Sequence, residues 1–344
     1  MMTRYLLFKI AVLLVLGAVL LVLGMVVGMN YAPVTANKAV SYPPTYKGPV
    51  IGILTQKTNG QFQRYGHSYI AASYVQWRAV KFYIQKIKFT SYTFSSEFRH
   101  HIIMFQTFPI SKFYEASKYI YDWTVNFNKN GSYFPLWGTC LGFEAILYAE
   151  ANTNVTSDIR FKCSAHMPNN LTIQEGAQNS RMLSNLDSKL YQAVQTEQLV
   201  YNSHSFCIGA EQIESPDGPL HNNFNLLAVN WDANGKQYIA LAEHKKLPIY
   251  ASQFHTEKSA FEWTTYKSTI PHTKNAILFM QYLANFFVGE ARQSKNQFSE
   301  SVEFYKRSIN NYKPVYTAIA LNYFLESCYF FHDRRDDLLL DTTD

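Results

Sequence analysis

The chain has 344 residues, of which 47% are hydrophobic and 16% charged, with 25 Tyr and 25 Phe. This composition excludes general disorder, because it provides enough apolar surface to bury a core. The formal net charge is +6, but the Lys and Arg residues are scattered along the chain, so we expect no nucleic-acid-binding stripe and no nucleic-acid partner.

The first 30 residues have the pattern of a secretory leader. Arg4 and Lys9 precede an uninterrupted run of apolar residues and glycine from Ile10 to Met29. A run of this length is just able to span a bilayer, so we interpret residues 1–30 as a cleaved signal peptide or an uncleaved signal anchor. The small residues of the segment 34–36 favour cleavage. In both cases the rest of the chain enters the secretory pathway, and it meets a membrane only through an uncleaved anchor.

Sequons and cysteines agree with that compartment. The sequons, which are glycosylation candidates, begin at Asn130, Asn154 and Asn170. No two cysteines have the CxxC spacing of a zinc knuckle, so we predict no metal site. An oxidising lumen permits a disulfide among Cys163, Cys207 and Cys328, whose pairing the sequence leaves open, and Cys140 is expected to stay free.

A proline-containing linker over residues 31–47 leads to one main domain, which we predict over residues 48–295. Strands and helices alternate along it, as a parallel sheet with helices on both faces requires. The predicted strands are 49–56, 133–139, 224–232, 237–244 and 247–255, and the predicted helices are 68–79, 112–127, 141–150 and 273–291. The turn at residues 233–235 predicts a hairpin between the strands that flank it. Residues 296–344 are expected to pack on the domain as a C-terminal extension with a disordered end.

The segment 80–110 does not follow this pattern. No glycine occurs from His67 through Asn130, and the segment is basic and aromatic without a clean period. An α/β domain normally has glycine where a strand meets a tight functional loop. We consider two interpretations, a divergent β-rich segment or a gene-model error.

The strongest chemical signal is the sequence Gly138-Thr-Cys-Leu-Gly142, which has the GxCxG pattern of a nucleophile on a sharp strand-to-helix turn. The glycines allow close backbone approach, and the backbone N–H of Leu141 is placed to stabilise an oxyanion. The amino end of the following helix favours a Cys140 thiolate. The alternative is a packed turn in which Cys140 is a small buried residue.

A nucleophilic thiol needs a base that a third group orients. His255 follows a predicted apolar strand, and Glu257 comes two residues later. Because parallel strands end at the same edge of a sheet, we expect His255 to lie near Cys140. The alternative is an ordinary surface or core histidine.

Six segments together resemble the gamma-glutamyl hydrolases, which are related to class I glutamine amidotransferases. They are GPVIGILTQ, YGHSYIAASYV, YFPLWGTCLGFE, NSRM, ASQFHTEKSAFEW and HTKNAILFMQYLANFFVGEAR. The resemblance implies a flavodoxin-like, doubly wound α/β fold and cysteine-dependent hydrolysis of gamma-glutamyl bonds in folylpoly-gamma-glutamates. It implies Cys140 as nucleophile, His255 as general acid/base, Glu257 as the third residue and His204 near the substrate. It also implies no cofactor, a lysosomal, vacuolar or extracellular location, and a possible homodimer.

Two departures from the family pattern matter. Phe254 and Thr256 stand where the family has tryptophan and proline around the histidine. The FPGG-like loop that supplies an oxyanion donor has no counterpart in the glycine-free segment, and losing one such donor typically costs about 100- to 1000-fold in turnover. The alternatives are therefore a catalytically impaired or non-catalytic relative, a carrier with the same fold, and a glutaminase-type amidotransferase, against which the leader argues.

Overall fold

The computed structural model describes residues 49–78, 83–87, 101–105, 112–151, 159–264, 269–296, 298, 304–305, 307–318 and 325–332. All of them belong to the unit Pro44–Asp344. The predicted leader and linker lie outside the described residues, as do Asn154 and the end of the chain from residue 333. Among the described helices, none is both long and apolar enough to cross a membrane.

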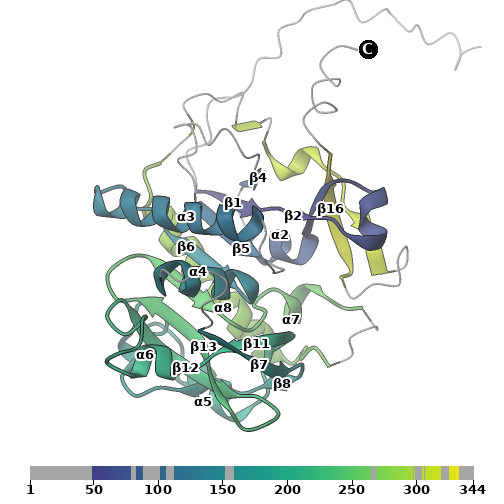
Figure 1. The fold of residues 1–344 in the computed structure, drawn as a ribbon. Coiled ribbons are helices and arrows are strands. Elements are labelled where there is room, and N and C mark those ends of the chain that lie inside the picture. The colour runs from purple at the N-terminus through teal and green to yellow at the C-terminus, as the bar shows by residue number, and fades with distance from the viewer. Residues whose placement is uncertain are drawn as a thin grey trace, which may run out of the picture. The chain divides into compact units, whose positions relative to one another are not determined.

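An eight-stranded sheet forms the centre of this unit (Figure 1). Five parallel strands lie in the order β4-β1-β5-β6-β14, and three antiparallel strands, β13, β12 and β9, continue the sheet beyond β14. The parallel part has the 2-1-3-4-5 order of flavodoxin-like sheets. The bounds are Tyr83–Ile87 (β4), Val50–Leu54 (β1), His101–Phe105 (β5), Leu136–Thr139 (β6), Ile249–Ser252 (β14), Gln237–His244 (β13), Phe224–Trp231 (β12) and Thr172–Ile173 (β9). The predicted doubly wound, mostly parallel α/β fold is confirmed.

Helices cover both faces of this sheet because side chains alternate along its strands. Leu136 of β6 packs in a cluster with helices α3 and α4, whereas the next residue, Trp137, packs in a second cluster with α2 and α8. The bounds of these helices are Lys112–Lys129 (α3), Leu141–Ala151 (α4), Ala72–Arg78 (α2) and Lys274–Gln293 (α8). A strand with both faces buried explains the near-continuous apolar sequence around β6.

The smaller elements form three further sheets. A four-stranded sheet has the order β15-β16-β3-β2, and two-stranded ribbons pair β7 with β11 and β8 with β10. Their bounds are Val315–Tyr316 (β15), Ser327–Phe331 (β16), Ser68–Ala71 (β3), Gln56–Lys57 (β2), Arg160–Ala165 (β7), His204–Ile208 (β11), Pro168–Asn169 (β8) and Val200–Tyr201 (β10). The short helices are Ser188–Thr196 (α5), Glu211–Glu214 (α6) and Lys258–Phe261 (α7), with 3-10 turns at Gly60–Arg64, Ala177–Asn179 and Ile309–Asn311.

Several predicted boundaries were wrong. The first predicted helix, 68–79, is helical only over α2. Its first four residues form β3 instead, because they pair with β16 from the far end of the chain. The strand predicted from 133 begins at Leu136, after Pro135, which has no N–H to donate. The strand predicted to reach His255 ends at Ser252. The predicted hairpin is confirmed, since β12 and β13 pair antiparallel and Gly235 takes a positive φ of 77° in the turn.

The glycine-free segment contributes to the central sheet. β4 and β5 both come from it, and each pairs in parallel with β1. The residues between these strands lie outside the described residues, as does the connection 106–111 from β5 to α3. The segment thus supplies strands at the positions that a flavodoxin-like sheet needs, which favours the interpretation as a β-rich segment.

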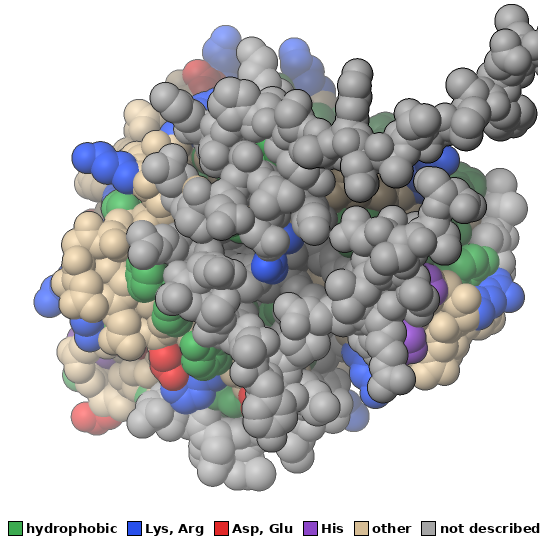
Figure 2. All heavy atoms as spheres, turned by 90° about the horizontal axis from the view of Figure 1, so that it is seen from above, with side chains coloured by type: hydrophobic (Ala, Val, Ile, Leu, Met, Phe, Trp, Pro, Cys, Tyr) green, Lys and Arg blue, Asp and Glu red, His purple; other side chains and the backbone are tan. Residues whose placement is uncertain are grey.

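One disulfide joins Cys163 of β7 to Cys207 of β11, and Cys140 and Cys328 are free. The expectation that Cys140 stays free is confirmed. Of the sequon asparagines, Asn130 is exposed just after α3, and Asn170 is exposed while its Nδ2 donates to the Gln195 carbonyl at 2.6 Å. On the face shown in Figure 2, the Lys and Arg side chains are separated by other residues rather than gathered in one patch.

Candidate active site

Cys140 occupies the turn between β6 and α4. Its φ of 54° is the only positive φ of a non-glycine residue in the described part of the chain. Its N–H donates to the Ser252 carbonyl at 2.8 Å, and its own carbonyl accepts from the N–H of Glu144 at 3.1 Å. A left-handed conformation costs an L-residue about 1–2 kcal/mol, and such strain concentrates at functional sites. The turn therefore has the geometry of a nucleophile elbow.

Gly138 makes this turn possible. A Cβ atom at that position would lie 2.4 Å from the Gly142 carbonyl oxygen and 2.7 Å from Cδ1 of Ile146. The end of β6 and the start of α4 thus approach more closely than any side chain allows. The first glycine of GxCxG serves close strand-to-helix packing here, and it takes an ordinary negative φ.

The environment of the Cys140 thiol favours its neutral form. The residue is 7% exposed, and burial, followed by the carboxylates of Glu144 and Glu257, raises the pKa of the thiol. The Leu141 N–H and the Lys258 ammonium lower it, but by less. The expected preference for a thiolate at the helix end is outweighed in this structure by burial. A neutral thiol needs a base to take its proton before it can act as a nucleophile.

His255 and Glu257 form a buried pair. Nδ1 of His255 lies 2.8 Å from Oε1 of Glu257, and the two side chains are 1% and 0% exposed. Burial lowers the pKa of His255, although Glu257 opposes this shift. Burial opposes ionisation of Glu257, but the neighbouring His255 and Lys258 hold its pKa below the usual value. A neutral His255 that donates Nδ1–H to an ionised Glu257 leaves Nε2 as a proton acceptor.

Sheet register brings Cys140 and His255 to the same edge. β14 lies parallel to β6, with Ser252 opposite Thr139, so Cys140 and His255 follow the carboxyl ends of neighbouring strands. The His255 N–H donates to the Tyr201 carbonyl at 2.9 Å, which anchors the loop after β14 on β10. Among the hydrogen bonds of the described residues, none joins the Cys140 thiol to the His255 ring. Such contacts commonly tighten only when substrate is bound.

Sequence reasoning missed Tyr74, which α2 places at the same site. Its hydroxyl lies 3.4 Å from Nδ1 of His255, and the side chain is buried. Burial, together with the charges of Glu257 and Cys140, raises the pKa of this tyrosine, so it stays a neutral hydrogen-bonding group. The segment YGHSYIAASYV contains Tyr74, but no local pattern distinguishes it from its neighbours.

The buried pair of Glu144 and Arg160 was also missed. Nη1 of Arg160 lies 3.2 Å from Oε2 of Glu144, and Nε2 of Gln253 lies 3.5 Å from Oε1. Burial raises the pKa of Glu144 to about 7, with Arg160 acting against this shift. A carboxyl group one helical turn after Cys140 thus changes protonation state near neutrality.

His204 lies in the interior beside the disulfide. Its Nδ1 is 3.0 Å from the Phe206 carbonyl and 3.7 and 3.6 Å from the sulfurs of Cys163 and Cys207, and Nε2 is 3.2 Å from Oδ1 of Asn202. Burial lowers the pKa of His204 to about 3, although the Phe206 carbonyl opposes this shift and the nearby His255 adds to it. His204, Cys163 and Cys207 lie within 4.8 Å of one another, but the disulfide takes both sulfurs, which leaves one metal ligand.

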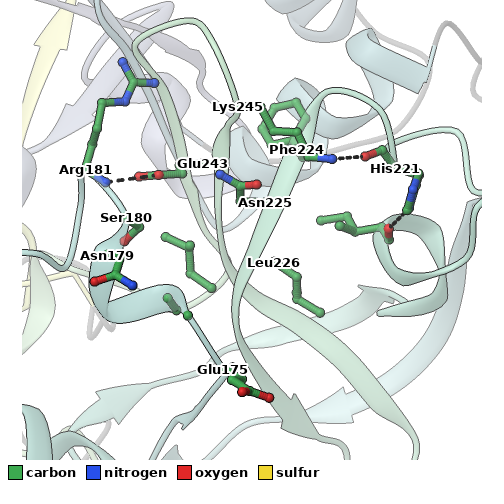
Figure 3. A pocket seen from close by; sticks show the side chains of 14 residues that line it. Glu175, Asn179, Ser180, Arg181, His221, Phe224, Asn225, Leu226, Glu243 and Lys245 are labelled. Carbon is green, nitrogen blue, oxygen red and sulfur yellow. Dashed lines mark hydrogen bonds between the residues drawn. The ribbon is translucent and has the colours of Figure 1, made fainter.

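A pocket of about 580 Å³ lies elsewhere in this unit, beside the antiparallel strands (Figure 3). Glu243 faces the Arg181 backbone N–H there, while the Arg181 side chain points away and Lys245 donates to the His221 carbonyl. In the sheet register, Glu243 of β13 lies opposite Tyr250, near the start of β14. Cys140 instead follows Thr139 of β6, which lies opposite Ser252 at the end of β14. Neither Cys140, His255 nor Glu257 lines this pocket.

Comparison with known proteins gives consistent matches. The family model "Glutamine amidotransferase class-I" matches residues 117–267. Gamma-glutamyl hydrolase B of Dictyostelium discoideum is 34% identical over 78% of this chain and 79% of its own length. The human gamma-glutamyl hydrolase is 32% identical over 83% of this chain and 91% of its own length. A solved glutamine amidotransferase from Thermotoga maritima covers 73% of this chain and 100% of its own, at 10% identity and a TM-score of 0.41.

Proposed function

Because the chain belongs to the gamma-glutamyl hydrolase family, we propose that it hydrolyses gamma-glutamyl bonds with Cys140 as the nucleophile. The observation that carries this proposal is the strained Cys140 turn, which lies at the same sheet edge as the buried pair of His255 and Glu257. The substrate class that follows is the folylpoly-gamma-glutamates, in which successive glutamates are joined through side-chain carboxyl groups.

The reaction proceeds through an acyl-enzyme. His255 takes the thiol proton as the Cys140 sulfur attacks the gamma-amide carbonyl carbon, and the carbonyl oxygen becomes an oxyanion. The C–N bond then breaks while His255 gives that proton to the leaving amine. Water attacks the thioester with His255 as base, the C–S bond breaks, and the sulfur recovers its proton. Glu257 keeps the imidazole in the required tautomer and stabilises the imidazolium.

The Leu141 N–H is the backbone donor that we propose for the oxyanion. It lies at the first position of α4, directly after Cys140, and it acts to lower the pKa of the Cys140 thiol. The connection 106–111, which leaves the sheet from β5 beside β6, lies outside the described residues. The proposed steps use the side chains of Cys140, His255 and Glu257 and the backbone N–H of Leu141.

We further propose a secretory-pathway location, with the extracellular space, lysosome or vacuole as destination. The predicted leader, the exposed sequon at Asn130 and the Cys163–Cys207 disulfide support it, because disulfides persist in oxidising compartments. The same disulfide argues against a cytosolic glutaminase subunit. A homodimer stays a prediction from the resemblance.

Incubation of the purified secreted protein with a folate polyglutamate, followed by assay of released glutamate, tests the activity. We expect release by the wild type and none above background with Cys140→Ala, because the attacking atom is removed. The matched control is Cys328→Ala, which removes the other free thiol and is expected to retain activity. Equal release by Cys140→Ala and wild type would contradict the assignment.

A further inference from the structure

Two glutamates join the segment after the His255–Glu257 pair to the C-terminal part of the chain. Oε2 of Glu262 accepts a hydrogen bond from the N–H of Glu326 at 2.7 Å. Oε2 of Glu326 in turn accepts one from the N–H of Trp263, also at 2.7 Å. Each carboxyl group thus satisfies a backbone N–H of the opposite segment, which a buried backbone group requires. We call these two hydrogen bonds the Glu262–Glu326 clasp.

Glu326 belongs to a part of the chain that is itself held in a sheet. Its carbonyl accepts from the N–H groups of Thr317 and Ala318, at 2.8 and 3.1 Å, and the residue directly precedes β16. β16 pairs with β15 on one side and with β3 on the other. The clasp therefore fastens the segment after the pair to the four-stranded sheet.

Helix α7 connects the clasp to Glu257. This helix is a single turn, and Glu257 is the residue before it and Glu262 the residue after it. The N–H of Glu262 donates to the Lys258 carbonyl at 2.9 Å, which closes the turn, so its two ends move together. The position of Glu262 therefore sets the position of Glu257, whose Oε1 lies 2.8 Å from Nδ1 of His255.

The same sheet also reaches the pair through α2. β3 ends at Ala71 and α2 begins at Ala72, so the strand leads directly into the helix that carries Tyr74. The Tyr74 hydroxyl lies 3.4 Å from Nδ1 of His255, and α2 packs against α7. The four-stranded sheet is thus connected to His255 through Tyr74 and to Glu257 through the clasp.

Burial of Glu262 needs a reason other than stability. The side chain is 1% exposed, and burial raises the pKa of its carboxyl group, although Lys258 and the Glu326 N–H oppose this shift. Buried ionisable groups are weak evidence for stability, because apolar residues of similar size often serve as well or better. A carboxyl oxygen that accepts from one defined N–H instead fixes a direction, which apolar contacts do not.

We propose that Glu262 is a positioning residue, which holds the Glu257 carboxylate against His255 by fixing α7 to the four-stranded sheet. Glu326 is its partner in this role. The effect of Glu262 on the reaction passes through Glu257. This inference rests on the proposed function, since it concerns the orientation of the proposed base.

The test is a double-mutant cycle of Glu262→Ala and Glu257→Gln, assayed with a folate polyglutamate. A misplacement of about 1 Å can cost about 100-fold, so we expect Glu262→Ala to lower kcat about 10- to 100-fold with little change in KM. In the Glu257→Gln background it should add little, because the carboxylate that it positions is already absent. Glu262→Gln keeps an acceptor for the Glu326 N–H and should recover most of the loss. Equal losses in both backgrounds would overturn the proposal.

Glu326→Ala provides a second variant, because Glu326 is only half-buried and its removal disturbs the core less. It removes the bond to the Trp263 N–H and leaves the bond from its own N–H to Glu262. We expect a smaller loss of kcat than in Glu262→Ala, again dependent on Glu257. An unchanged kcat in both folded variants would contradict the role of the clasp.

Glu243→Ala is the matched control. Glu243 is also a buried glutamate that accepts from a distant backbone segment, with Oε1 3.1 Å from the Arg181 nitrogen and Oε2 3.0 Å from the Met182 nitrogen. It lines the pocket that excludes the His255–Glu257 pair. We expect Glu243→Ala to lower the free energy of unfolding and to leave kcat unchanged. Equal losses of kcat in Glu243→Ala and Glu262→Ala would indicate a merely structural effect and would overturn the proposal.

Proton NMR of the resting protein reads the same role without turnover. The Nδ1–H of His255 that donates to Glu257 should give a downfield resonance, identified by its absence from His255→Asn. We expect Glu262→Ala to shift or abolish this resonance and Glu243→Ala to leave it in place. An unchanged resonance in Glu262→Ala would overturn the proposal. An inactive wild type would instead contradict the proposed function, while the NMR comparison still decides the role of Glu262.

Discussion

The two sides of the candidate active site are built in different ways. The Cys140 side is made by one contiguous stretch, in which β6, the turn and α4 follow each other directly. The His255 side is assembled from distant parts of the chain, with Tyr201 anchoring the backbone and Tyr74 contacting the ring. Local backbone constraints therefore form the Cys140 turn, whereas long-range packing places His255, its proposed proton acceptor. Substitutions on the His255 side should therefore mainly lower activity, whereas substitutions in the Cys140 turn should first lower stability.

Apart from the loss expected for Cys140→Ala, the largest effect is expected on the His255 side. His255→Asn removes the proposed proton acceptor, and general acid–base catalysis typically contributes about 100- to 10,000-fold, so we expect a loss of that size in kcat/KM. Glu257→Gln keeps the imidazole and is expected to lose less. Steady-state kinetics with a folate polyglutamate measure both, and circular dichroism checks that both variants are folded. A loss in Glu257→Gln that exceeds the loss in His255→Asn would contradict the assigned roles.

On the Cys140 side the first consequence should be lost stability. Gly138→Ala places a Cβ against the backbone of α4, at 2.4 Å from the Gly142 carbonyl oxygen. We expect the free energy of unfolding to fall by about 1–3 kcal/mol, as for other overpacked positions. Urea unfolding measures it. The control is Gly289→Ala in α8, where a Cβ meets nothing within 4 Å and the change should be neutral or slightly stabilising. Equal changes in the free energy of unfolding for Gly138→Ala and Gly289→Ala would contradict close packing at Gly138.

The smallest expected effect is a change in the pH dependence of stability through Glu144. This residue belongs to the Cys140 side, and Gln253 of the His255 side contacts it. Burial raises the pKa of Glu144 from 4.5 to about 7, so the protonated acid favours the folded state. Its stabilisation is complete below pH about 4.5 and is lost as the pH rises through about 7. Glu144→Gln has no such dependence. We expect the Tm of the wild type to fall relative to this variant between about pH 5 and pH 8. A constant difference in Tm across this range would show that Glu144 does not titrate there.

Much of the fold could be predicted from the sequence where local preferences agree with tertiary contacts. The alternation of apolar strands and helices was sufficient to predict a parallel sheet with helices on both faces, and α3, α4 and α8 begin within a residue of their predicted positions. The first predicted helix failed because Ser68–Ala71 pairs with Ser327–Phe331, and no local pattern reports a partner about 260 residues away.

The sequence by itself determined the Cys140 turn, since Gly138 permits a close approach of β6 to α4 that a Cβ atom would prevent. It also made His255 and Glu257 the candidate pair, because both follow one apolar strand. Only the tertiary structure decided that Cys163 pairs with Cys207, that Tyr74 contacts His255 and that Arg160 meets Glu144. These contacts join segments that are far apart in the chain, and they form because sheet register and burial bring them together, which local sequence does not encode.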